Sequence, residues 1–350
     1  MIPLTNWRSS LKSTWTCRDC SASADWAVTA PDPLIIALAL LLDLIVGDPR
    51  WLPHPVVAIG RLIHVLDQGL RRPWLDQRSA GILLLLITAG SAAGASWLLL
   101  QLLTVFHPLA GFLGAVLISS TCLAARSLHV ESARVATALA AGDLQTARHY
   151  LSWIVGRDTN LLEETDIWRA LVETVAENTS DGIIAPLFWL TAGGPVAAMA
   201  YKGVSTLDSM VGYKNEHYLQ MGWASARMDD LLNFIPARLT ALLLIIAAPL
   251  TGRSAVAAAR ITLRDRLKHP SPNSGHPEAA AAGALGIRLG GAASYGCVAS
   301  WKEQIGDPLQ PIDQEAYRVM IRLMYISTIL MAALCIAAAF CLRGINVPSL

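Results

Sequence analysis

Charged residues are scarce in this chain. Asp, Glu, Lys and Arg together make up 15% of the 350 residues, whereas soluble domains usually contain about 25%. Hydrophobic residues account for 54%, and the mean hydropathy is +0.45. Because a soluble protein of this length needs a charged surface, the composition argues against a soluble globular fold. The net charge is only +1, so no basic field indicates nucleic acid as a partner.

Several familiar functional signatures are also absent. The sequence has no G-x-x-x-x-G-K-S/T loop, no G-x-G-x-x-G after a predicted strand, no H-E-x-x-H and no G-x-S-x-G. The six cysteines follow no disulfide spacing, which suits a reducing compartment. Cys17 and Cys20 form one C-x-x-C pair without a second pair to complete a zinc site, so we interpret that pair as incidental.

Uncharged stretches long enough to cross a membrane dominate the chain instead. About 20 apolar residues cross a bilayer, and four stretches reach full length: 82–106, 109–125, 183–201 and 323–342. His107-Pro108 predicts the turn of a helical hairpin between the first two. Residues 33–46, which carry Asp43, and the short stretch 239–250 are weaker candidates. We predict an all-α, polytopic membrane protein with about four to six membrane segments and polar helical loops.

Positive charge predicts which loops face the cytoplasm. Arginines cluster between residues 61 and 78, and again in 253–268; both segments are expected on the cytoplasmic side of the inner membrane. The second also predicts contact with anionic lipid head groups. Residues 1–30 lack the apolar core of a signal peptide, so we interpret them as a cytoplasmic extension or loosely attached tail. Residues 31–350 then form a single membrane domain.

Gly193-Gly194-Pro195 lies in the middle of the third full-length stretch. Such a break either kinks a helix or splits it into a re-entrant hairpin. We favour the hairpin, because it would bring the polar segments 126–181 and 202–235 to one face of the protein.

The densest polar segment runs from Arg157 to Asp181. On a helix, Glu173 and Glu177 lie one turn apart on one face, with Asp181 a further turn on. Arg169, four residues before Glu173, is placed to neutralise it. Three acidic groups next to an apolar span fit a site for Mg²⁺ or a substrate amine. A solvated helix face with one ion pair fits the same spacing equally well.

Two more polar segments carry candidate groups. One contains Lys202, Asp208, Tyr213, Lys214 and the pair Asp229-Asp230. These residues also have explanations other than ligand binding. Lys202 could extend its ammonium group to the membrane interface, and the two aspartates could mark the start of a helix.

The other segment, residues 271–278, leads into an Ala-rich helix. Asn273 and Ser274 at its start could cradle a phosphate or carboxylate oxygen. Gly283, Gly286, Gly290 and Gly291 follow, at spacings that we interpret as close helix packing.

The polar segments resemble those of the CobD/CbiB family, the adenosylcobinamide-phosphate synthases of cobalamin biosynthesis. The similar stretches are DLIVGDPRWLPHP (43–55), GRDT (156–159), VETVAENTSDG (172–182), APLF (185–188), YK (201–202), TLD (206–208), MVGYK (210–214), WASARMDD (223–230), SPNSGHPEA (271–279) and GALGIRLGG (283–291). They run in order over residues 33–342. His276 departs from the pattern, which has an aromatic such as Trp there in many members, so we give it no acid–base or metal role.

The resemblance implies an ATP-dependent amide ligation of adenosylcobyric acid with (R)-1-amino-2-propanol O-phosphate, or with aminopropanol itself. The product is then adenosylcobinamide phosphate, or adenosylcobinamide. ATP and Mg²⁺ are the expected co-substrate and metal. Corrinoid, aminopropanol, membrane lipid and later membrane enzymes of the same pathway are the expected partners.

The needs of that reaction give the polar residues hypothetical roles. The hypothetical catalytic set is Glu173, Glu177, Lys202, Asp229 and Asp230, and the Mg²⁺ ligands are Glu173, Glu177 and Asp181. Substrate or phosphate binding is assigned to Arg157, Asp158, Asn178, Asp208, Tyr213, Lys214, Asn273, Ser274 and Glu278. The alternative is a non-catalytic membrane sensor or small-anion transporter of the same fold, like the distant AmpE-type relatives.

Overall fold

The computed structural model describes residues 31–48, 54–213, 215–295 and 298–345. The N-terminal extension, the Cys17/Cys20 pair and Lys214 lie outside these ranges. The helices, in chain order, are α2 Pro33–Ile45, α3 Pro55–Leu70, α4 Gln77–Phe106, α5 Pro108–Ser120, α6 Ala125–Ala140, α7 Leu144–Leu151, α8 Glu164–Thr179, the π-helical turn η1 Ser180–Ile184, α9 Ala185–Val211, α10 Trp223–Leu232, α11 Phe234–Ala247, the 3₁₀ turn η2 Pro249–Thr251, α12 Ala255–Asp265, α13 Gly275–Leu285 and α14 Gln314–Ile345. An antiparallel hairpin of β1 Arg288–Tyr295 and β2 Val298–Gly306 precedes α14.

The described helices confirm the predicted membrane character. Four stretches are long and apolar enough to cross a membrane: Gln77–Phe106, Pro108–Ala140, Glu164–Val211 and Gln314–Leu342. The pair α10 and α11, bent by 46°, makes a fifth if it counts as one span, and α2 is a shorter apolar helix. These helices indicate a multi-pass membrane protein.

Local signals in the sequence set the helix ends. Asp76 caps α4 by accepting hydrogen bonds from the N–H groups of Arg78 and Ser79. His107 ends α4, and its Nδ1 accepts the Leu109 N–H at the start of α5, next to Pro108 at the first helical position. The predicted hairpin turn at His107-Pro108 is therefore confirmed.

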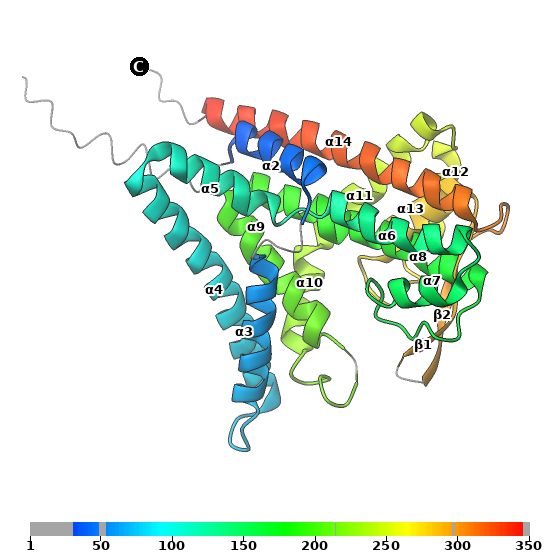
Figure 1. Ribbon diagram of the computed structural model, residues 1–350, viewed down its shortest axis with the longest axis horizontal. Helices are drawn as coiled ribbons and strands as arrows, with labels where there is room; N and C mark the ends of the chain where they lie inside the picture. Colours follow the sequence, from blue (N-terminus) through cyan, green and yellow to red (C-terminus); the bar gives the residue numbers. More distant parts are fainter. Residues whose placement is uncertain (1–30, 49–53, 214, 296–297, 346–350) are drawn as a thin grey trace, which may run out of the picture.

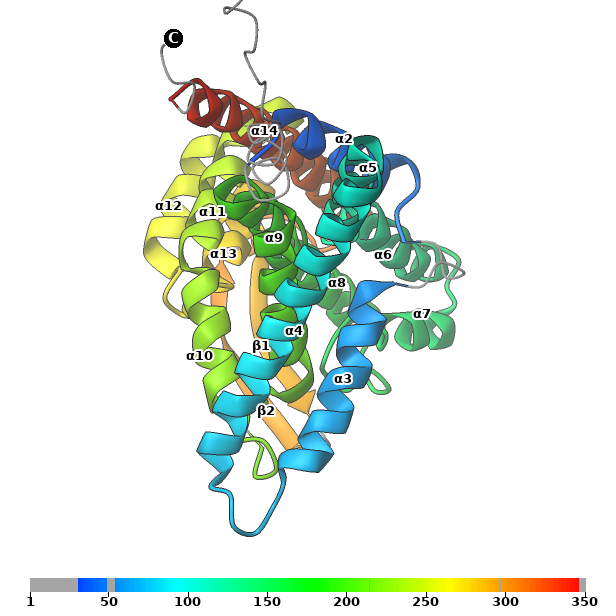
Figure 2. The same ribbon diagram turned by 90° about the vertical axis from the view of Figure 1, so that its left-hand side faces the viewer.

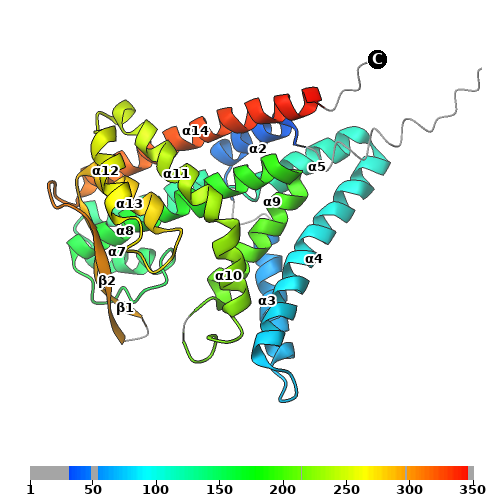
Figure 3. The same ribbon diagram turned by 180° about the vertical axis from the view of Figure 1, so that it is seen from behind.

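The helices form two unequal groups. Helix α14 runs along one side of the molecule beside α2, which in turn packs on α5, while α3, α4 and α10 extend away from that layer (Figure 1). Figure 2 shows α3, α4 and α10 as neighbours, with the hairpin behind them. From behind, α11, α12 and α13 pack near α14 at the end that also carries α7, α8 and the hairpin (Figure 3).

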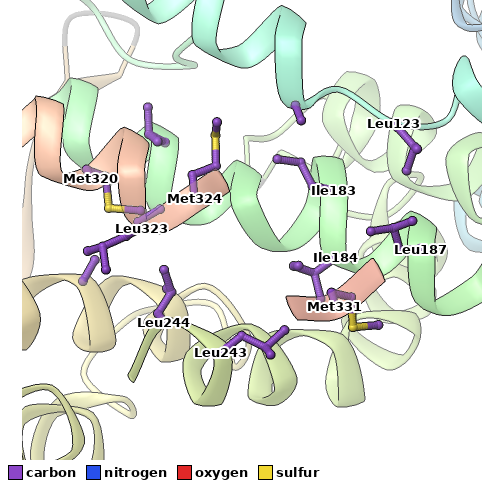
Figure 4. Packing of buried hydrophobic residues seen from close by; sticks show 14 of the residues in the cluster. Leu123, Ile183, Ile184, Leu187, Leu243, Leu244, Met320, Leu323, Met324 and Met331 are labelled. Carbon is purple, nitrogen blue, oxygen red and sulfur yellow. The ribbon is translucent and has the colours of Figure 1, made fainter. Parts of the chain in front are cut away.

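A core of aliphatic and methionine side chains connects η1 and α9 with α11 and α14. Ile183, Ile184 and Leu187, all fully buried, belong to the same cluster as Leu243 and Leu244 of α11 and several side chains of α14 (Figure 4). The α14 contribution consists of Met320, Leu323, Met324 and Met331. Because this core holds η1 and the start of α9 in place, it also fixes the polar residues on their other faces.

The Gly193-Gly194-Pro195 break folds the chain back. Gly193 and Gly194 have non-helical backbone angles inside α9, with φ of 70° and ψ of −167° at Gly194. The hydroxyl of Tyr201 lies 3.0 Å from the carbonyl oxygen of Asp181. Twenty residues of continuous helix would separate these positions by about 30 Å. The break thus brings the segments before and after it together, as the hairpin hypothesis required.

We expect Gly194→Ala to destabilise the protein. Its backbone angles fall in a region open almost only to glycine, so a Cβ costs about 1–3 kcal/mol. The melting temperature in detergent should fall. The matched control is Gly90→Ala on α4, where a Cβ would meet nothing within 4 Å; alanine should be neutral or stabilising there. Equal melting temperatures for Gly194→Ala and wild type would contradict the expectation.

The hairpin corrects the prediction that the polar loops are all helical. Gly290 and Gly291, interpreted above as helix-packing residues, lie in β1 with φ of 79° and 95°, at an irregularity in the strand register. Gly283 does allow close helix packing, since a Cβ there would lie 2.7 Å from the Ala257 carbonyl oxygen. Short strands rich in glycine and alanine carry little local signal, because their partners come from tertiary contacts.

Candidate functional site

Five carboxylates from four helical elements lie close enough to interact with one another. We call them the acidic cluster: Glu177 of α8, Asp181 of η1, Asp208 of α9, and Asp229 and Asp230 of α10. Asp181 interacts electrostatically with Asp229, Glu177 and Asp208. Asp208 also interacts with Asp230 and Glu177. A cationic ligand would relieve the repulsion between these carboxylates.

A buried tyrosine and an asparagine position two of these carboxylates. The Tyr201 hydroxyl, 1% exposed, lies 2.9 Å from Asn233 Oδ1 as well as beside the Asp181 backbone. Asn233 Nδ2 donates to Asp229 Oδ2 at 3.0 Å. Asn233 occupies the bend between α10 and α11. The fold-back of α9 and the bend after α10 therefore determine together where Asp181 and Asp229 lie.

The start of α13 borders the acidic cluster. Ser274 Oγ donates to Glu177 Oε1 at 2.8 Å, and Asn273 Nδ2 donates to the Asp230 carbonyl oxygen at 2.8 Å. The structure thus joins two polar segments that lie about a hundred residues apart in the chain. The predicted helix start at Asn273-Ser274 is confirmed.

Glu173 lies next to the acidic cluster but has its own partners. Its carboxylate accepts hydrogen bonds from Arg157 Nη2 and from the Gly290 N–H at 2.8 Å. Arg169 instead pairs with Asp166 at 2.8 Å, so the prediction that Arg169 neutralises Glu173 is wrong. Arg157 reaches Glu173 because the loop before α8 runs back along the buried face of α8.

Asp158 anchors the same loop to the hairpin. Its N–H donates to the Ser294 carbonyl oxygen at 2.9 Å, and its carboxylate accepts from Ser294 Oγ at 2.8 Å. Arg157 and Asp158 thus connect the α7–α8 loop to α8 and β1, a structural role within the residues described.

Glu278 and His269 form a second buried pair near Glu173. His269 Nε2 lies 3.6 Å from Glu278 Oε1, and both side chains are almost fully buried. Burial, followed by repulsion from Glu173 and Glu177, raises the pKa of Glu278 well above its ordinary value of 4.5. Burial also lowers the pKa of His269. Neutral forms of both groups are favoured at this position.

We expect Glu278→Gln to remove a pH-dependent loss of stability. Because the folded-state pKa of Glu278 is raised, stabilisation from the neutral carboxyl is complete below the unfolded value of about 4.5 and is lost as the pH rises toward the folded one. The melting temperature of wild type relative to Glu278→Gln should therefore fall as the pH rises above about 4.5. Glu303→Gln, at an exposed position of β2, is the matched control. A constant difference across that range would contradict the expectation.

The remaining predicted residues have other surroundings. Lys202 interacts electrostatically with Asp43 and Asp48. Asn178 Nδ2 donates to the Thr174 carbonyl oxygen of its own helix, and Tyr213 is 47% exposed. Asp229 and Asp230 lie in the second half of α10, so the alternative that they start a helix is wrong.

The donor types fit Mg²⁺ shared with a phosphate ligand. No group of three or more His, Cys, Asp or Glu among the described residues is arranged to hold a metal ion. Mg²⁺ usually keeps several waters and binds through one or two carboxylates together with substrate phosphates. Such a carboxylate pair would be Asp181 and Asp229, or Asp208 and Asp230. It would not need the three ligands Glu173, Glu177 and Asp181 that the spacing predicts.

Several residues at the site carried no readable sequence signal. Tyr201 and Asn233 look like ordinary helix residues until the fold-back places them beside Asp181 and Asp229. His269 is a single histidine in a basic stretch, and only its burial against Glu278 marks it. In the sequence, Tyr201 is marked only by the resemblance, through the stretch Tyr201-Lys202.

Comparison with known proteins agrees with the motifs. The family model described as CobD/Cbib protein matches residues 36–324. A cobalamin biosynthesis protein CobD of Pelobacter propionicus is 66% identical over 320 residues, covering 91% of this chain and 99% of that protein. One of Geobacter metallireducens is 59% identical, covering 83% and 92%. The cobalamin biosynthesis protein CbiB of Salmonella typhimurium is 47% identical, covering 88% and 98%.

No solved structure matches the chain. The family match extends from α2 into α14 and includes every residue of the acidic cluster. Two relatives are 66% and 59% identical to the chain over 99% and 92% of their own lengths. The similarity therefore includes the polar segments as well as the membrane helices. The chain belongs to the CobD/CbiB family of cobalamin biosynthesis proteins.

Proposed function

We propose that the protein is an ATP-dependent acid–amine ligase that joins an aminopropanol unit to the free carboxylate of adenosylcobyric acid. Membership of a cobalamin biosynthesis family carries the proposal. The acidic cluster supports it, because a set of carboxylates beside polar helix starts suits a cationic amine and Mg²⁺-bound phosphates. The acceptor is (R)-1-amino-2-propanol O-phosphate or the free amino alcohol.

The chemistry explains why ATP is needed. A carboxylate is a poor electrophile, so one of its oxygens first attacks the γ-phosphorus of ATP, giving an acyl phosphate and ADP. The amine nitrogen, once deprotonated, then attacks the acyl carbon, and inorganic phosphate leaves with the bonding electrons. The sum is acid plus amine plus ATP giving amide, ADP, phosphate and a proton. Mg²⁺ bound to the phosphates would offset their charge.

The acidic cluster receives the amine in this proposal. Asp181 and Glu177 attract the ammonium form, and Asp229, held by Asn233, accepts the proton that the amine must lose. In this proposal Lys202 and Lys214 bind phosphate oxygens, whereas Arg157 is already paired with Glu173. We place the protein in the inner cell membrane with this site facing the cytoplasm, where ATP is available, and in contact with later membrane enzymes of the pathway.

Reconstitution tests the proposal directly. Purified protein would be incubated with ATP, Mg²⁺, adenosylcobyric acid and aminopropanol, with or without its phosphate, and the corrinoid product would be identified by mass spectrometry. We expect one amide bond and one ADP per product. ADP release without amide, or no product with either acceptor, would overturn the ligase proposal.

A membrane sensor or small-anion transporter is the second candidate. It is favoured by a broken helix next to polar groups, an arrangement that transporters use for binding sites. Growth rescue separates the two: a ligase restores cobinamide formation in a strain blocked at that step, and a sensor or transporter does not.

A further inference from the structure

Two arginines and a histidine meet at the start of α13, and neither arginine has a carboxylate partner among the described residues. Arg238 belongs to α11, Arg266 caps the end of α12, and His276 lies in the first turn of α13. Arg266 lies close enough to Arg238 for the two charges to repel each other. Both arginines also lie close enough to His276 to disfavour its protonated form. Like charges that face one another repel, so something must compensate for bringing them together.

Neither guanidinium is neutralised by the protein in the described ranges. Arg238 Nη1 donates to the carbonyl oxygen of Phe234 at 2.6 Å and to Asn273 Oδ1 at 3.3 Å, and its guanidinium lies 3.5 Å from the Phe234 ring centre. Arg266 donates to the Leu263 carbonyl oxygen at 3.0 Å. All these acceptors are neutral, so both positive charges stay uncompensated.

The carboxylates nearest in sequence serve other cations. Asp265 pairs with Arg264 and Lys268, and Arg264 also pairs with Asp307. Within the basic segment 253–268, Arg264 and Lys268 thus anchor the hairpin through Asp265, Asp307 and Gln304, whereas Arg266 faces Arg238 of α11. That division separates structural cations from those free to bind a ligand.

His276 supplies the observation that points to a ligand. The residue is 6% exposed, and its Nε2 has no hydrogen-bond partner among the residues that the structure describes. An unsatisfied buried polar atom costs about 1–3 kcal/mol, which a bound hydrogen-bonding group would recover. Burial and the two arginines lower the pKa of His276 to about 4, and an anion placed among the three groups would offset that repulsion.

We propose that Arg238, Arg266 and His276, with the N-terminal end of α13, form a phosphate-binding site. Helix N-termini favour such anions, and planar guanidinium groups match phosphate oxygens. Asn273 connects this site to the acidic cluster, because it contacts Arg238 through Oδ1 and Asp230 through Nδ2. A phosphate held here would lie next to the carboxylates that receive the amine. This step rests on the proposed function for its link to catalysis.

The same chemistry would recognise the phosphate of ATP, of a phosphorylated amine or of a lipid head group. Phe234, Ile235 and Leu263 are exposed hydrophobic side chains near the two arginines, as expected where a protein meets the lipid interface. Binding measurements must therefore compare a soluble phosphate with a phospholipid.

The test uses the full chain in a maltoside detergent, which carries no phosphate. Pyrophosphate or phosphatidylglycerol is added at increasing concentration, and the rise in melting temperature gives an apparent Kd. Wild type should be stabilised saturably by one or both. Arg238→Gln or Arg266→Gln should weaken that binding by about tenfold and the double variant by about a hundredfold, as for lost charge-assisted hydrogen bonds. His276→Phe, which keeps a ring but removes Nε2, should weaken it less.

Arg260→Gln is the matched control, because Arg260 is an exposed arginine of α12 and should leave the Kd unchanged. Stabilisation by pyrophosphate alone assigns the site to a soluble phosphate, and stabilisation by phosphatidylglycerol alone assigns it to a lipid. No stabilisation of wild type, or an unchanged Kd in the folded double variant, overturns the site. Binding that persists without amide formation would overturn the ligase proposal and leave the phosphate site standing.

Discussion

Glu177→Gln should lower the rate of amide formation by about a hundredfold or more, without loss of the fold. Glutamine keeps the shape and can still accept the 2.8 Å hydrogen bond from Ser274. It removes one charge from the acidic cluster, whose members repel one another. An electrostatic contribution to a catalytic site is commonly worth ~10²–10³ in rate. The melting temperature should stay the same or rise, since the repulsion decreases.

That pairing of lost activity with retained stability separates a binding role from a structural one. Glu131→Gln is the control, because Glu131 pairs with Arg134 near the surface of α6, and it should leave both quantities nearly unchanged. Product formation by Glu177→Gln within a few-fold of wild type would remove Glu177 from the site. A lower melting temperature together with low activity would make its role structural.

Arg157→Ala should cost the protein about 3–5 kcal/mol of stability, the usual loss when one partner of a buried ion pair is removed. The side chains of Arg157 and Glu173 are 10% and 3% exposed, so removing the guanidinium would leave the Glu173 carboxylate buried without its ion-pair partner, although the Gly290 N–H would still donate to it. Since that carboxylate holds β1 against α8, protease cleavage in the hairpin should increase along with the fall in melting temperature.

A double-mutant cycle isolates the ion pair. Adding Glu173→Gln to Arg157→Ala removes the unpaired charge, so the double variant should be more stable than Arg157→Ala alone. Arg134→Ala, in a half-exposed pair, should change stability by only about 0–1 kcal/mol. Equal losses for Arg157→Ala and Arg134→Ala would show that the buried pair contributes no more than a surface pair.

The apolar helices could be predicted from the sequence because their signal is local. A run of uncharged residues such as 82–106 carries its own evidence, and Asp76 and His107 mark the ends within a few residues. The Gly193-Gly194 break is equally local, because its backbone angles suit glycine and Pro195 follows directly. The hairpin was missed because β1 and β2 depend on each other and on Glu173 of α8.

Within the site, the sequence located polar segments but not partners. Glu177 and Asp181 were found as one acidic run, and their association with Asp229 depends on the fold-back and on Tyr201 and Asn233. The spacing predicts Arg169 as the ion-pair partner of Glu173, because Arg169 lies one turn away on the same helix. In the tertiary structure the partner is Arg157 instead. Partners that lie outside one helix face cannot be read from its periodicity.

The sequence by itself determined that this chain is a multi-pass membrane protein of the CobD/CbiB family, because hydropathy and ordered motifs are properties of consecutive residues. Only the tertiary structure decided which charges meet. It gathered Glu177, Asp181 and Asp229 beside the start of α13, and gave Arg238 and Arg266 no carboxylate partner within the part of the chain that it describes. The physical reason is that electrostatic and hydrogen-bond energies depend on distance in space, which a folded-back helix makes nearly independent of distance along the chain.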